Sequence, residues 1–475
     1  MIAALLVTLT LLVALAVTLR EARVAREQAA IARAQKSRAE QRFNDVRKLA
    51  NSLIFEVHDS IRSLPGATQA RELLVSRALE YLDSLSREAS GDPSLQRELA
   101  AAYERVGDVL GSTDNANVGD FAGASRSYAK ALAIWESLAA ANPTDVSVQI
   151  GLAGEYFRTT QILEDMGDFS EARETMRRAQ PLIQKMAAGQ NDPRLQTQLA
   201  GLYHYTARTL EKTGDFAGAL QNYRQAAAIL EPIAANPRTN VFVRGYLAGN
   251  YDGMAKMLTQ TGRADEAAPM AAKALAILKQ LSDDNPTNAT LREYLAAAYG
   301  ISANSAKEKG DPREALELYH REHEIFKELS FADRSNQLAA LNFCISDLNV
   351  GEVLVGQGRV SEGLRRIREA LAIVRGAPGS NNLWAKTGLS LSYSDLGMAY
   401  AALADHAVSA NEKTRYWREA RSWDQRGLDI WSQKLSTARV LDANGHDQVA
   451  HLTQQLAKCD AELRELQARP LTPRQ

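Results

Sequence analysis

A repeat of about 48 residues runs through most of the chain and constrains its fold more than any other feature. A turn that begins with glycine recurs six times, and four of the five intervals between successive glycines are identical, while the other is shorter by one. They are Gly119, Gly167, Gly214, Gly262, Gly310 and Gly358. Such regularity indicates an array of like units packed on one another, so a chain of 475 residues need not divide into several domains.

Two helical patterns flank each of these glycines. After the glycine, a small, a large and a small residue follow at steps of four and three, as in Ala219, Tyr223 and Ala226, which places them on one helical face. Before it, leucine and tyrosine recur four residues apart; the tyrosines are Tyr156, Tyr203, Tyr251 and Tyr299. This register predicts that the tyrosines pack in the core and do not bind a ligand.

The N-terminal residues have a different composition. Residues 2–19 are an uncharged, mainly apolar run. As a helix this run would be about 27 Å long, close to the roughly 30 Å of a membrane's hydrocarbon core. We expect a transmembrane helix at 1–19 that contacts the lipid bilayer through residues 2–19. A cleaved signal peptide, with a site near Ala14-Leu15-Ala16, is the alternative.

The remaining segments follow from helical periodicity and from breaks at Pro and Gly. Residues 20–64 contain neither breaker and predict a long amphipathic juxtamembrane helix. Residues 70–94 predict an N-terminal capping helix, and 95–435 the repeat solenoid. Residues 446–467 predict a C-terminal helix that caps the array or pairs with a second copy; Asn or Asp before Pro, as at Asp192-Pro193, is expected to end a unit.

The whole region resembles the tetratricopeptide repeat (TPR) pattern, although its period exceeds the roughly 34 residues that are usual for that pattern. Tyr393, Leu396, Gly397 and Tyr400 match the first helix of the pattern, and the Ala/Tyr/Ala triplets match the second. The resemblance implies an all-α, TPR-like α-solenoid of about seven extended helix pairs with a period of 47–48. It covers residues 95–435 and specifies a fold, not a ligand.

A second resemblance covers the segment after the apolar run. The stretch 42–56, then Leu64-Pro65-Gly66-Ala67-Thr68, then 77–83 and 91–100, resembles the membrane-anchored TPR region of bacterial receptor-type serine/threonine protein kinases. The chain starts at the apolar helix and lacks the Gly-rich loop, His-Arg-Asp and Asp-Phe-Gly motifs of a kinase domain. The resemblance therefore implies kinship with the non-catalytic half.

Composition and motifs argue against several other functions. Lys and Arg number 56 against 57 Asp and Glu, so the near-neutral chain has no field for nucleic acid, and we expect no nucleic-acid partner. Two cysteines cannot build a disulfide framework or a thiolate zinc site. His320 and His323 lie one turn apart without a matching second ligand pair, so we expect a solvated helix face there. We expect no enzymatic activity, no metal and no cofactor.

A binding surface is expected on the concave face, which first helices usually line in a solenoid. The residues one and five positions after the tyrosines would point to it: Phe157, Gln161, His204, Arg208, Asp252, Lys256 and Asn304. Their mixed charges suggest a protein or extended polar peptide as partner.

The sequence thus predicts a non-catalytic, membrane-anchored TPR protein for protein interaction or ligand sensing. One alternative is the sensor half of a transmembrane kinase whose catalytic domain is missing or separately encoded. Another is an assembly scaffold that forms homo-oligomers through 20–64 or 446–467. The net charge of +5 in residues 20–48 favours a cytoplasmic solenoid, whereas the kinase resemblance implies an extracytoplasmic one, which we prefer.

Overall fold

The computed structural model of the protein describes residues 2–61, 64–74, 77, 92–111, 117–189, 191–236, 239–376, 383–437 and 443–468. These ranges contain helices, turns and loops but no strand. The chain divides into two compact units, Met1–His58 and Asp59–Gln475.

The first unit is one long helical segment. Helix α1 (Ile2–Asn51) continues without a break through a π-helical turn, η1 (Ser52–Val57), into α2 (His58–Ile61), which begins at the unit's last residue. The predicted membrane span at 2–19 is helical, but the side chains of residues 1–17 lie outside the described set, so the span stays a prediction.

One helix within the described part of the chain has the length and apolar composition of a membrane span. This is α14 (Gln337–Gly356), in the second unit. The share of its apolar window that is buried in the protein is 61%, as expected of a core helix. Its composition therefore gives only weak support for a membrane location.

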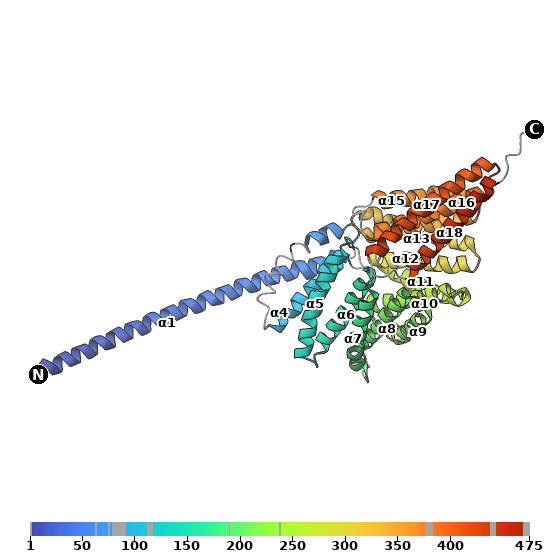
Figure 1. Cartoon of the computed structure of the whole chain (residues 1–475). Helices are drawn as coiled ribbons and strands as arrows, with labels where there is room; N and C mark the ends of the chain where they lie inside the picture. Colours follow the sequence, from blue (N-terminus) through green and yellow to red (C-terminus); the bar gives the residue numbers. More distant parts are fainter. Residues whose placement is uncertain are drawn as a thin grey trace, which may run out of the picture. The chain divides into compact units, whose positions relative to one another are not determined.

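The second unit consists of helix pairs that follow one another in chain order (Figure 1). Residues 68–74 are helical before the first pair. The pairs are α4 (Pro93–Gly111) with α5 (Phe121–Ala141), α6 (Val146–Asp165) with α7 (Phe169–Ala187), α8 (Pro193–Lys212) with α9 (Phe216–Ala234), α10 (Val241–Gln260) with α11 (Ala264–Asp284), α12 (Ala289–Glu308) with α13 (Pro312–Ala332), α14 with α15 (Val360–Gly376), and α16 (Leu383–His406) with α17 (Ala410–Thr437). Helix α18 (Ala443–Ala468) packs on α17 and α16.

The six glycines of the repeat all occupy the left-handed region that the turn requires. Their φ angles lie between 72° and 85°. At Gly214 the turn is closed by a hydrogen bond of 2.9 Å from the Asp215 N–H to the Leu210 carbonyl, and the same bond recurs after Gly167, Gly262, Gly310 and Gly358. This geometry ends the first helix of these five pairs and favours glycine, because a Cβ is strained at positive φ.

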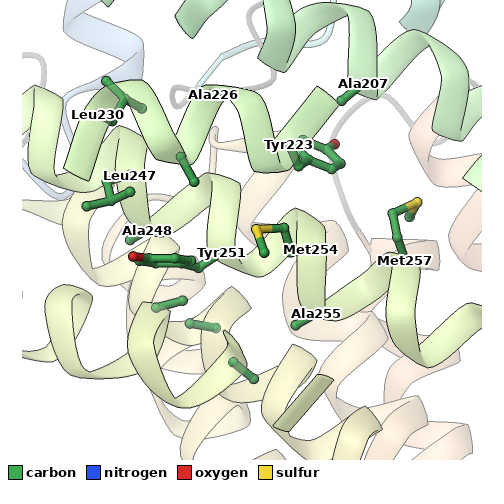
Figure 2. Close-up of a cluster of buried hydrophobic side chains, with 14 of the residues drawn as sticks. Ala207, Tyr223, Ala226, Leu230, Leu247, Ala248, Tyr251, Met254, Ala255 and Met257 are labelled. Atoms are coloured by element: carbon green, nitrogen blue, oxygen red, sulfur yellow. The ribbon is translucent and has the colours of Figure 1, made fainter. Parts of the chain in front are cut away.

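Small residues allow the helices to approach closely in the hydrophobic core around α9 and α10. Ala219 and Ala226 are fully buried on either side of Tyr223, as the small–large–small pattern predicts. A Cβ on Gly253 would lie 2.6 Å from the Tyr223 ring, so only glycine fits there. Figure 2 shows Tyr223 of α9 in one cluster with Tyr251 of α10.

The prediction that these tyrosines pack in the core is confirmed. Tyr156 and Tyr251 are buried, and Tyr203 and Tyr299 are half-buried against the core cluster that contains Tyr251. The Tyr156 hydroxyl donates to Glu136 at 2.9 Å, so its polar end is satisfied by the protein itself.

One local prediction is wrong, and another falls partly outside the described residues. Asp192-Pro193 does not end a helix but begins α8: Asp192 accepts from the Arg194 N–H at 2.8 Å, and Pro193 is the first helical residue, where its missing N–H is tolerated. The predicted capping helix at 70–94 is helical at 70–74, whereas residues 78–91 lie outside the described set and α4 starts at Pro93.

Candidate functional site

The first helices of successive pairs form the inner side of the solenoid. Helix α6 contacts α8, α8 contacts α10, α10 contacts α12, and α14 contacts α16. Within the described ranges no comparable contact joins α7 to α9 or α9 to α11. Because elements converge on the inside of a curved stack, the first helices line its concave face.

An aromatic row crosses this inner face from α6 to α10. The rings of Phe157 and Tyr205 stack at 4.8 Å, His204 meets Tyr246 at 4.8 Å, and Tyr246 stacks on Phe242 at 5.6 Å. Tyr205 and His204 are neighbours on α8 and complete the row. Exposure changes along it: Phe157 is only 7% exposed, whereas Phe242 is 68% exposed.

A ladder of ion pairs runs beside the aromatic row and joins adjacent first helices. Arg158 of α6 lies 3.5 Å from Glu104 of α4, and Lys307 of α12 lies 3.1 Å from Glu352 of α14. Between them stand Arg208 with Glu164, at 3.8 Å, and Lys256 with Glu211. These four pairs link each unit to a neighbouring one, so their charges are already partnered within the protein.

Burial shifts the pKa of one group in the row and of one in the ladder. Burial, with a smaller contribution from the charge of Arg208, lowers the pKa of His204 to about 3. This ring is therefore neutral near pH 7, and it lies 3.1 Å from the Asn250 side-chain oxygen, so Nδ1 carries the proton. Burial also raises the pKa of Glu164, although Arg208 and Thr209 oppose that shift.

Glu211 shows the opposite balance. Its burial raises the pKa, but Lys256 and Lys212, together with a hydrogen bond from Tyr223, outweigh that effect and leave the pKa lowered. The Glu211 carboxylate is consequently held in its charged form beside Lys256. The inner face thus combines an apolar aromatic row with fixed charges.

The predicted binding residues are only partly accessible. Phe157, His204 and Arg208 come together in and beside the aromatic row, with Arg208 over the Tyr205 ring at 5.7 Å. Lys256, with a side chain 51% exposed, faces solvent beside Glu211. Asn304 is exposed and accepts a hydrogen bond of 2.6 Å from the Tyr319 hydroxyl.

The expected exposure of three of these residues is corrected by the packing. Phe157, Gln161 and Asp252 are all buried, because the next first helix covers the face on which they lie. Their binding role stays a prediction. The sequence-based set did not include Tyr246 and Phe242, although their spacing of four residues on one helix was a signal available in the sequence.

The histidine pair also departs from expectation in one member. His320 is exposed, as predicted, but His323 is only 3% exposed. Its Nδ1 lies 3.3 Å from Asp347, and burial, together with the charge of Arg366, lowers its pKa to about 4. Across the described part of the chain no group of three or more potential ligands could hold a metal ion.

Helix pairs, left-handed glycine turns and small-residue packing together define the class of this protein as a TPR-like α-solenoid. No family model matches the chain, and no curated protein matches it. Among solved structures, a Rap protein complexed with competence and sporulation factor is 12% identical, with a TM-score of 0.46, over 88% of this chain and 99% of that one. BtubC from P. vanneervenii is 18% identical, with a TM-score of 0.42, over 54% and 91%.

A third structure of TPR-like repeats has a shorter match. A putative kinesin light chain from Podosopora anserina is 17% identical, with a TM-score of 0.36, over 50% of this chain and 98% of that one.

Proposed function

We propose that this chain is a non-catalytic protein-interaction module that binds an extended peptide segment of a partner along the inner faces of α6, α8 and α10. The observation that carries the proposal is the aromatic row, which ends at the exposed Phe242. Isolated exposed phenylalanines are common, but one continuous with four further rings offers a ready apolar contact. A partner's apolar side chain would cover Phe242 and Tyr246.

The ion-pair ladder sets the polar part of this recognition. Lys256 is half-exposed and lies on the same helix as Phe242, about 21 Å further along it, so it is available to a second part of an extended partner that carries a carboxylate or carbonyl group. Arg208 is less available, since its side chain is 20% exposed and paired with the buried Glu164. Reversing the charge of Arg208 would therefore disturb stacking as well as binding, and Lys256 is the cleaner position to change.

The experiment is a selection of displayed random peptides on the full chain in detergent micelles, followed by affinity measurement with an enriched peptide. We expect Phe242→Ala to weaken binding at least tenfold, because the partner loses its apolar anchor. Phe331→Ala is the matched control: Phe331 is 59% exposed but lies on a second helix, α13. Equal losses in the two variants, or no enriched peptide at all, would contradict the proposal.

We further propose that residues 2–19 anchor the chain in a lipid bilayer and that the solenoid lies outside the cytoplasm. The apolar run and the kinase-like segment that follows it support this proposal. Protease added to intact cells should then digest the solenoid, whereas a cytoplasmic marker survives. Protection of the solenoid until the membrane is lysed would show the opposite orientation.

A second candidate function is the sensing half of a receptor-type kinase, favoured by the Leu64–Thr68 motif. An immunoblot of native membranes separates the two: a band near 52.0 kDa indicates a stand-alone protein, and a much larger one indicates a receptor kinase. For the alternative of an oligomeric scaffold, α1 is the better candidate contact, because Val24 and Ile31 are exposed on it. On α18, by contrast, Leu452 and Cys459 are buried within the second unit.

A further inference from the structure

Residues 64–71 form a compact turn at the start of the second unit. The Ala67 N–H donates to the Leu64 carbonyl at 3.3 Å, and Gly66 has a φ of 84°. Proline second and glycine third are the residues that a type II β-turn favours. The Arg71 N–H then donates to the Ala67 carbonyl at 2.9 Å, which begins a helical turn.

This turn contacts a surface that is far away in sequence. The surface is made by α12, α13 and the loop between α13 and α14, and we call it the rim. The Thr68 N–H donates to Asp333 Oδ2 at 3.0 Å, across 265 residues. The other oxygen of Asp333 accepts from the Ser335 hydroxyl at 2.7 Å. Burial alone would raise the pKa of Asp333, but the hydrogen bonds from Thr68 and Ser335 outweigh it and lower the pKa. Asp333 is thus held as a charged acceptor for the turn.

The rest of the rim is shaped to the turn. Leu64 and Pro65 share a small pocket with residues of α12, α13 and the loop between α13 and α14: Ala289, Thr290, Glu293, Leu329, Asp333 and Asn336. A Cβ on Gly66 would lie 3.0 Å from the Ala332 carbonyl oxygen, a tight contact at a position whose positive φ already favours glycine.

The helical part of the segment brings a cation to the same rim. Arg71 is fully buried, and its positive charge acts to lower the pKa of Glu293, which burial raises to about 7. Glu293 also accepts a hydrogen bond of 3.2 Å from the Asn336 side chain. The next residue, Gln337, donates its N–H to the Asn117 carbonyl at 3.3 Å, so the rim also contacts the loop that precedes α5.

We propose that the rim of α12–α14 is a docking site for a Pro-Gly turn followed by arginine, and that its occupant is the chain's own residues 64–71. The contact is an intramolecular latch that holds the start of the second unit on the fifth helix pair and on the loop before α14. Release of the latch frees the rim and loosens the contact between Gln337 and Asn117.

A peptide supplied in trans tests the docking site. The probe is a fluorescein-labelled peptide of residues 60–77, titrated against the full chain in detergent micelles. The wild-type chain should not bind it, because the tethered segment is present at an effective concentration of about a millimolar. A Gly66→Val/Arg71→Ala chain, whose own segment is strained and lacks the cation, should bind it. Adding Asp333→Ala to that chain should weaken binding at least tenfold.

The controls make each outcome decisive. Glu72→Ala, which changes an exposed neighbour, should behave like wild type and leave the peptide unbound. No binding to the Gly66→Val/Arg71→Ala chain, when circular dichroism shows its helices intact, would overturn the proposal. Equal binding with and without Asp333→Ala would overturn it as well.

Hydrogen exchange of the unmodified chain gives a second test that needs no folded variant. The amides of residues 67–74 should exchange at least tenfold more slowly than those of an unstructured peptide of the same sequence. Exchange at the unstructured rate would show that the latch does not form. In Asp333→Ala, exchange should rise in residues 64–74 while the core of α10 keeps its protection.

Discussion

At the scale of single residues, glycines and buried carboxyl groups have a strong influence on the stability of this protein. Two glycines on α10 differ in whether packing requires them. Gly253 faces the Tyr223 ring, whereas nothing lies within 4 Å of a Cβ on Gly249. The first is required by packing and the second is not.

The matched pair Gly253→Ala and Gly249→Ala tests this distinction. We expect Gly253→Ala to destabilise the protein by about 1–3 kcal/mol, because the added methyl group forces Tyr223 to move. Gly249→Ala should stabilise it by about 0.5–1 kcal/mol, since alanine favours the helix. Urea denaturation followed by circular dichroism measures both. Equal shifts in the two variants would show that Tyr223 does not pack against Gly253.

Buried carboxyl groups should make stability fall as pH rises. Burial raises the pKa of Glu322 to about 8, against an ordinary value of 4.5, although a hydrogen bond from Asn349 lowers it in part. A raised pKa in the folded state means that stability is lost as pH rises from about 4.5 to 8. The free energy of unfolding of Glu322→Gln, relative to that of wild type, should therefore increase across this range by on the order of 3–5 kcal/mol.

The exposed Glu317 lies on the same helix as Glu322 and provides the control for this pH dependence. Denaturation curves at pH 5 and pH 8 for wild type, Glu322→Gln and Glu317→Gln check the prediction. A Glu322→Gln gain that is the same at both pH values would contradict the pKa shift.

At the scale of elements, α18 closes the open end of the array. Leu452 is fully buried beside Trp431 of α17, whereas Thr453 is exposed. We expect Leu452→Asp to detach α18, because an unpaired charge cannot be buried there, and Thr453→Asp to have little effect. Tryptophan fluorescence should shift to longer wavelength only in Leu452→Asp. An unchanged spectrum in that variant would show that α18 does not cover Trp431.

The elements were the most predictable part of this protein. Glycine turns and small–large–small triplets encode the helix pairs locally, so their order could be predicted from the sequence. The inner face could not, because the exposure of Phe157 or Asp252 depends on how closely the next first helix approaches. Contacts over hundreds of residues, such as Thr68 with Asp333, leave no periodic signal in the sequence.

At the scale of the second unit, the central claim is that an array of helix pairs presents its first helices to a partner. Hydrogen exchange of the full chain, with and without a selected peptide, tests this claim most directly. We expect slower exchange in α6, α8 and α10, strongest around Phe242 and Tyr246, and little change in α7, α9 and α11. Protection confined to the second helices, or none at a saturating peptide concentration, would contradict the account.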